Sequence, residues 1–318
     1  MPSSRVSSVR AHLPTPLLVR LVRLVSLVVV VVGVVGLEPE ARACAVCAAG
    51  ETTLAPREGG KPTAGGYGGA ADVRIGSLRS GNTARLRELR LETSVHFAPF
   101  EGYRFRLAVP ALVRSVTAPG SDGARALSAG DLIASMDTEL DRSARDLFGR
   151  PWRRVLVLTV GLALPTAPAA RDSRGDYLPS IFQPGCNAVT PEVELSYRFT
   201  DARFTFSVGP RARLPLPVRE APHRGAMVGL GASVQWQPHV RFAARLGTSA
   251  RLELEGADAR GRGDGLSGGF FGYLSPELVV RPTASTTLTA GVYAPIVQIT
   301  RGGQFESAVF ATRLAFEL

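Results

Sequence analysis

The sequence predicts an all-β protein, a transmembrane antiparallel up-and-down β-barrel of about twelve strands over residues 70–318. Side chains alternate between apolar and polar along much of the chain, which is the periodicity of a strand with two unlike faces. Tight turns alternate with long loops, as in outer-membrane barrels. The longest uncharged apolar run after residue 43 is 155–164. It is too short for a spanning helix, which needs about 20 residues, but long enough for a tilted spanning strand of about 9–11.

The first 43 residues have the pattern of a cleaved signal peptide. Four arginines precede an uncharged apolar run at residues 24–37, and an Ala-Arg-Ala sequence ends at Ala43. This order of basic region, apolar region and small-residue cleavage site is typical of export signals. A retained anchor helix and lipid attachment at Cys44 are alternatives, although Ala41 stands where a lipid-attachment signal has a large aliphatic residue.

Composition allows a folded body and argues against a nucleic-acid partner. The 318 residues are 45% hydrophobic and 20% charged, with a net charge of +10. Such an apolar content excludes wholesale disorder. A basic chain invites a nucleic-acid interpretation, but the arginines are scattered, and an exported protein does not meet the chromosome.

The alternation is clearest from Tyr103 to Val113, where odd positions are apolar and even positions include Arg104 and Arg106. A strand of this kind has one apolar and one polar face. The same pattern recurs in further segments, at residues 89–97, 132–140, 155–164, 193–199, 204–211, 228–236, 240–246, 274–281, 288–294 and 310–318. A weaker candidate at 71–78 makes twelve.

The connections indicate which end of the barrel is which. The expected tight turns are at 99–102, 200–202, 238–239 and 282–285, with 141–151 as a longer member of that set. The expected long loops are at 115–128, 165–188, 215–225 and 256–267. Short turns are periplasmic in outer-membrane barrels, so an even strand number places both termini there. A soluble sandwich also alternates, but its strands are usually shorter than the 10–14 residues expected here, averaging about 5–6.

We expect the polar face to line the lumen with charges of both signs. The candidate lumen residues are Arg90, Glu92, His96, Arg104, Arg106, Arg114, Glu192, Glu194, Arg203, Arg211, Arg213, Arg241, Arg245, Glu277 and Arg313. These charges either pair with one another and stiffen a narrow barrel, or they line a solute path with a weak preference for anions.

Several short sequences resemble a known family. They are LALPT at 162–166, QPG at 183–185 followed by EVELSY at 192–197, YLSPEL at 273–278, and AGVYAP at 290–295. The chain, over roughly residues 86–318, resembles the outer-membrane β-barrel family of phenol-degradation meta-pathway transporters. The resemblance implies a barrel in the outer membrane of a Gram-negative cell, and passage of hydrophobic or aromatic solutes. It supplies no catalytic motif. Such barrels usually end on an aromatic residue, whereas this chain ends on Leu318.

The three cysteines suggest no cofactor. Cys44 and Cys47 form a CxxC in the predicted flexible periplasmic segment 44–69, where a local disulfide is expected in an oxidising compartment. A redox pair or half of a metal site is the alternative, but no His follows Cys47 and no second CxxC exists. Cys186 falls in the expected external loop 165–188 and is expected to be a free or intermolecular thiol.

The sequence predicts no enzyme. Glu92, Ser94 and His96 share one strand face, but alternate residues lie about 6.6–6.8 Å apart along a strand, too far for a preformed triad. The predicted function is a channel or transporter for small solutes. The alternatives are a structural or surface-interaction barrel with a plugged lumen and, in third place, an outer-membrane hydrolase. The expected partners are outer-membrane lipid, the barrel assembly machinery and a small solute.

Overall fold

A computed structural model describes residues 65–80, 84–117, 124–147, 150–201 and 203–317. The predicted signal peptide and the Cys44–Cys47 pair lie outside these residues. The described elements are β1 (Gly66–Ser80), β2 (Ala84–Ala98), β3 (Tyr103–Thr117), β4 (Ala124–Ala129), β5 (Leu132–Leu147), β6 (Arg150–Leu164), the 3-10 turn η1 (Ser180–Phe182), β7 (Ala188–Thr200), β8 (Phe204–Arg213), β9 (Leu216–Pro217), β10 (Met227–His239), β11 (Phe242–Glu253), β12 (Gly269–Thr283), β13 (Thr286–Thr300), β14 (Gln304–Glu306) and β15 (Val309–Glu317). Among the described residues, no helix has the length and apolar character needed to cross a bilayer.

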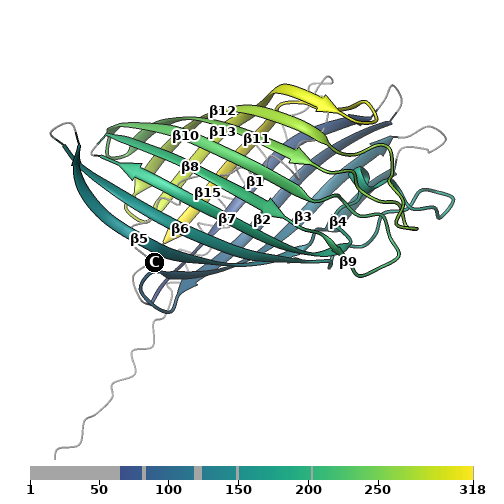
Figure 1. Ribbon diagram of the computed structural model, residues 1–318, viewed down its shortest axis with the longest axis horizontal. Coiled ribbons are helices and arrows are strands. Elements are labelled where there is room, and N and C mark those ends of the chain that lie inside the picture. The colour runs from purple at the N-terminus through teal and green to yellow at the C-terminus, as the bar shows by residue number, and fades with distance from the viewer. Residues whose placement is uncertain (1–64, 81–83, 118–123, 148–149, 202, 318) are drawn as a thin grey trace, which may run out of the picture. The chain divides into compact units, whose positions relative to one another are not determined.

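The strands form one closed antiparallel barrel (Figure 1). Strands that follow one another in the chain pair around the wall, and β1 closes it by pairing with both β2 and β15. Three short segments, β4, β9 and β14, extend this ladder at one end: β4 continues β5 along β3, β9 continues β8 along β7, and β14 continues β15 along β1. The wall therefore has twelve strands, as the sequence predicts.

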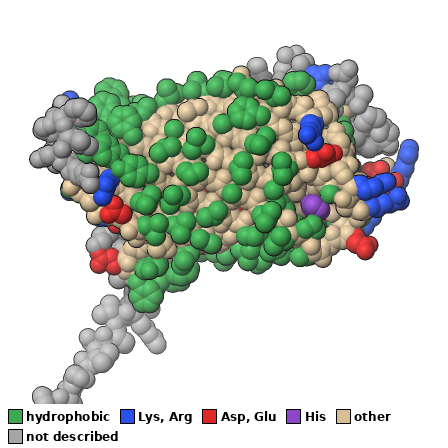
Figure 2. All heavy atoms as spheres, in the orientation of Figure 1, with side chains coloured by type: hydrophobic (Ala, Val, Ile, Leu, Met, Phe, Trp, Pro, Cys, Tyr) green, Lys and Arg blue, Asp and Glu red, His purple; other side chains and the backbone are tan. Residues whose placement is uncertain are grey.

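Burial is the inverse of that in a soluble barrel. On β2, for example, Val95 is 61% exposed while Glu92 is 5% exposed, so the apolar face points outward and the charged face inward. Apolar side chains are spread over the outer wall, and most of the charged side chains in view lie toward its two ends (Figure 2). Exposed apolar surface on this scale does not persist in water, but it matches a bilayer core. The soluble-sandwich alternative is therefore excluded.

Aromatic side chains gather on the outer face near the short turns. Phe97 and Phe105 stack with their ring centroids 5.4 Å apart, and Trp152 stacks on Phe199 at 4.6 Å. Further exposed members of this aromatic girdle are Tyr67, Tyr103, Phe206, Trp236 and Phe242. Amphipathic and aromatic rings favour the interface between headgroups and acyl chains, so the girdle marks one boundary of the membrane.

Several predicted boundaries were wrong. Residues 115–128 are not a long loop, because β3 continues to Thr117 and β4 begins at Ala124. The connection expected at 141–151 is a tight one, because β5 runs to Leu147 and β6 begins at Arg150. The turn expected at 238–239 lies two residues later, after His239. In each case the strand is longer than its apolar alternation, because the ends of the strands pass beyond the apolar belt into water.

Strand β1 begins at Gly66, so residues 66–69 belong to the barrel rather than to a flexible segment. A Cβ at Gly68 would collide with the backbone oxygen of Phe316, and one at Gly69 would lie 2.8 Å from that of Ser94. The two glycines therefore allow β1 to fit between β15 and β2, where the barrel closes.

Candidate functional site: the lumen

Thirteen of the fifteen predicted lumen residues lie on the inward face of the wall. They are Arg90, Glu92 and His96 on β2, Arg104, Arg106 and Arg114 on β3, Glu192 and Glu194 on β7, Arg211 and Arg213 on β8, Arg245 on β11, Glu277 on β12 and Arg313 on β15. Arg203 and Arg241 differ. They lie in the exposed turns before β8 and before β11, because those turns include residues that the sequence pattern assigned to strands.

Carboxylates in the lumen are shared between arginines. Glu92 accepts hydrogen bonds from Arg90 and Arg106, each at 2.8 Å. The carboxylate of Asp72 lies 3.8 Å from both Arg74 and Arg313. Each of these acids therefore joins neighbouring strands of the wall, and such cross-strand pairs stabilise the sheet.

A second buried cluster, which the sequence analysis missed, lies nearer the long loops. Arg251 is fully buried, donates to Glu306 at 2.5 Å, and lies over the ring of Phe271 at 4.2 Å. The Tyr273 hydroxyl donates to the same Glu306 carboxylate. The sequence could have identified Arg251, because it is an even number of residues from the inward-facing Arg245. It lies on the same face of β11, beyond the expected end of that strand.

The connection at residues 165–187, between β6 and β7, folds into the long-loop end of the barrel and is called the plug below. Its Leu178, Ile181 and Phe182 are buried. They pack against inward-facing apolar residues of the wall, namely Leu78, Leu86, Val116, Phe271, Tyr273, Tyr293 and Val309. This end of the lumen is therefore filled by an apolar core, in contrast to the charged remainder.

Polar bonds tie the plug to the wall at both its ends and near its middle, and the Thr166 hydroxyl accepts one of them from the N–H of Leu132 at 2.9 Å. Asp131, between β4 and β5, accepts from the backbone N–H of Ala167 at 3.1 Å and of Cys186 at 2.6 Å. Arg114 donates to the carbonyl of Phe182 at 2.7 Å and to Glu88 at 2.7 Å. Cys186, expected in an external loop, lies in the plug and is buried. Asp131 therefore holds both ends of the plug with one carboxylate.

Three cavities follow one another through the lumen. The mouth cavity, of about 500 Å³, lies at the short-turn end and includes Ser285 and Glu317 in its lining. It shares Arg106 with a middle cavity of about 120 Å³. The middle cavity shares Arg90, Ile133 and Arg213 with a plug-side cavity of about 40 Å³, which ends at residues 183–186 of the plug. The free space thus narrows steadily toward the plug.

The mouth cavity is strongly basic. Its lining includes seven arginines, Arg104, Arg106, Arg153, Arg198, Arg245, Arg281 and Arg313. His96 and one carboxylate, Glu317, complete the ionisable groups of the lining, and Glu317 lies 3.6 Å from Arg104. The middle cavity, in contrast, mixes five arginines with Glu92, Glu192 and Glu194.

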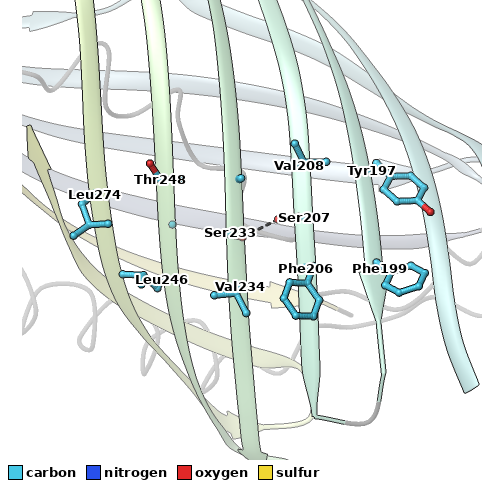
Figure 3. Close-up of a pocket in the computed structure, with 12 residues that line it drawn as sticks. Tyr197, Phe199, Phe206, Ser207, Val208, Ser233, Val234, Leu246, Thr248 and Leu274 are labelled. Atoms are coloured by element: carbon cyan, nitrogen blue, oxygen red, sulfur yellow. Dashed lines mark hydrogen bonds between the residues drawn. The ribbon is translucent and has the colours of Figure 1, made fainter. Parts of the chain in front are cut away.

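The outer wall carries a separate apolar groove of about 650 Å³ (Figure 3). Tyr197, Phe206 and Leu274 stand around it on the lipid-facing side. Ser207 and Ser233 also line it from the strands behind, and their hydroxyls are hydrogen-bonded at 2.7 Å. Strands β8 and β10 remain paired through this region. The groove is therefore a hollow in the outward-facing surface, and it shares no lining residue with the three lumen cavities.

The set Glu92, Ser94 and His96 lies in the lumen wall. Glu92 is held by Arg90 and Arg106, while Ser94 and His96 line the mouth cavity. The carboxylate that a triad would require is thus engaged by two guanidinium groups.

Comparison with known proteins identifies the fold. No family model and no curated protein matches the chain. Among solved structures, the COG4313 outer membrane channel from Pseudomonas putida F1 is similar, with 12% identity, a TM-score of 0.63, and coverage of 82% of this chain and 99% of that one. The translocator domain of the autotransporter NalP from Neisseria meningitidis is 9% identical with a TM-score of 0.45, covering 84% and 92%. The CymD monoaromatic hydrocarbon channel is 8% identical with a TM-score of 0.37, covering 80% and 88%. The first likeness and the apolar belt together establish an outer-membrane barrel.

Proposed function

We propose that the protein is an outer-membrane channel for small solutes, and that the solute follows the three lumen cavities. The observation that supports this proposal is the order of the cavities: each one shares lining residues with the next, from the short-turn mouth to the plug. A barrel of this size lies between those filled by side chains and the wide water-filled porins. The path is accordingly narrow and runs beside the ion pairs of the wall.

Among the described residues, the plug fills the long-loop end, so passage requires the plug to shift. The plug-side cavity of about 40 Å³ has room for a water molecule or two and not for an organic solute. Its boundary includes Asp131 and Cys186, which are hydrogen-bonded to each other. Opening therefore requires that this bond break, or that the plug bend between its two ends.

The lining favours solutes that carry polar or charged groups. Charged side chains surround the mouth and middle cavities, and an apolar solute there would leave them without solvation. The apolar cluster around Phe182 and Phe271 offers a surface to an aromatic ring once the plug has moved. A solute with both a ring and a charged group fits both parts, whereas a plain hydrocarbon fits the second alone.

Ion conductance in planar bilayers tests the proposal. Purified full-length protein should give discrete single-channel steps, and Asp131→Ala should raise the open probability because the plug loses two bonds. A wild type and an Asp131→Ala variant that both remain sealed, although correctly folded, would contradict a channel. Folding is checked by the mobility difference between unheated and boiled protein on a gel.

A structural or surface-interaction barrel is the second candidate, and the apolar packing of the plug favours it. In that case the plug is a permanent part of the core. The same measurement separates the two candidates, because a structural barrel predicts sealed bilayers for both proteins.

A further inference from the structure

We infer that the mouth cavity is a binding site for small organic carboxylates. The role of this site in transport rests on the proposed function. Binding itself requires no flow, so the two can be tested apart.

The first support is charge. Seven arginines line the cavity against the single carboxylate of Glu317. Three acids just outside the lining pair with these arginines, namely Asp72 with Arg313, Glu92 with Arg106 and Glu277 with Arg245. Within the lining itself the positive charges are in excess. A low-dielectric wall around such an excess concentrates anions.

Each of the three acids that pair with cavity arginines also contacts a second group. Glu92 accepts from Arg90 as well as from Arg106, and Glu277 accepts from the Tyr293 hydroxyl at 2.8 Å as well as from Arg245. Asp72 lies equally far from Arg74 and Arg313. None of these three acids therefore serves an arginine of the cavity alone.

The second support is unmet hydrogen bonding. The Nε atoms of Arg104 and Arg106 are buried, and neither has an acceptor among the described residues. Arg104 and Arg106 are two residues apart on β3, so their side chains leave the same face of the strand about 6.6–6.8 Å apart. A buried donor without an acceptor costs about 1–3 kcal/mol, so both guanidinium groups gain a hydrogen bond if they turn toward an anion in the cavity.

The chemistry of guanidinium selects the ligand class. Arginine presents parallel N–H donors that match the two oxygens of a carboxylate, and such pairs are short and strong. The cavity, at about 500 Å³, has the volume of an ordinary small-molecule site. Its arginines come from strands around the barrel, which suits a molecule with carboxylates at two ends. Succinate is the simplest probe of this kind.

Calorimetric titration of the full-length protein in detergent measures binding directly. Succinate should bind saturably, while its neutral analogue succinamide should not. The double variant Arg104→Gln/Arg106→Gln should weaken succinate binding at least tenfold, and Arg313→Gln should weaken it severalfold. Arg203→Gln is the matched control for Arg313→Gln, because it removes one positive charge from an exposed turn at the same end. It should change the affinity less than twofold.

Three results would overturn the site: equal binding of succinate and succinamide, unchanged affinity in both cavity variants, or inorganic phosphate binding as tightly as succinate. The last would make the cavity a general anion trap rather than a carboxylate site. Each variant must retain the heat-dependent gel shift; if the double variant does not fold, Arg313→Gln decides. If the barrel binds succinate but never conducts, the carboxylate site stands and the channel proposal is refuted. If the barrel conducts but does not bind succinate, the channel proposal stands and the carboxylate site is refuted.

Discussion

The carboxylate of Asp131 accepts a hydrogen bond from the backbone N–H of Cys186 at 2.6 Å. This bond and the companion bond from Ala167 join both ends of the plug to the wall between β4 and β5. Hydrogen bonds to a charged group contribute about 1.5–3 kcal/mol each. We therefore expect Asp131→Ala to loosen the plug and to raise the rate at which a thiol reagent labels Cys186 at least tenfold, in a Cys44→Ser/Cys47→Ser background.

Asp172→Ala is the control for this labelling experiment. Asp172 accepts bonds from the N–H groups of Arg174 and Asp176, so its contacts lie within the plug and do not reach the wall. The labelling rate of Cys186 should stay near that of the parent. Equal labelling in the Asp131 and Asp172 variants would show that the bonds to Asp131 do not hold the plug.

The Arg251–Glu306 pair predicts a large effect on stability. Both side chains are almost completely buried, and Glu306 also accepts from Tyr273. Replacing Glu306 by Gln leaves the buried Arg251 with only the more distant Glu253 carboxylate, 3.6 Å away, and breaking a buried pair in this way typically costs about 3–5 kcal/mol. The free energy of unfolding, measured by urea titration in lipid vesicles, should fall by about that amount.

An exposed pair provides the comparison. Arg262 lies 2.9 Å from Asp258 on the β11–β12 connection, with most of the arginine in water. Exposed pairs contribute about 0–1 kcal/mol, so Arg262→Gln should leave the free energy of unfolding nearly unchanged. A Glu306→Gln effect as small as that of Arg262→Gln would mean that water reaches the Arg251 site.

The sequence predicts the barrel wall well because the direction in which each side chain faces depends only on its position along its own strand. Each strand needs one face for lipid and one for the lumen, so parity alone identifies Glu92 and Val95 as facing opposite ways. Strand ends carry no such constraint once they leave the membrane. That is why the sequence predicts a loop at 115–128, although residues 124–129 pair with β3.

The plug was beyond sequence reasoning because its position depends on distant contacts. Phe182 is buried by residues of strands far from it in the chain, among them Leu78 and Tyr293. Nothing in the local sequence of 165–187 separates a loop that projects outward from one that folds inward. The role of Asp131 in holding the plug is hidden for the same reason, since its partners lie 36 and 55 residues away.

Neighbouring residues on β7 test the orientation of the wall. Leu195 faces outward and Ser196 faces the lumen. An arginine on the lipid face near the middle of the bilayer costs about 2–4 kcal/mol. Leu195→Arg should therefore lower the free energy of unfolding in vesicles by about that amount, while Ser196→Arg, in a polar lumen, should lower it less. The opposite order would indicate that the faces are exchanged.

The direction of insertion can be read with two single cysteines in the background that lacks Cys44 and Cys47. Arg260 is exposed on the connection between β11 and β12, at the long-loop end, and Ser285 is exposed in the short turn between β12 and β13. Because short turns face the periplasm in barrels of this type, a membrane-impermeant maleimide should label Arg260→Cys on intact cells. It should label Ser285→Cys only after the outer membrane is permeabilised, and the buried Cys186 gives the background signal. Labelling of Ser285→Cys on intact cells would place the basic mouth cavity on the outside, where it would be the entrance for carboxylates rather than their exit.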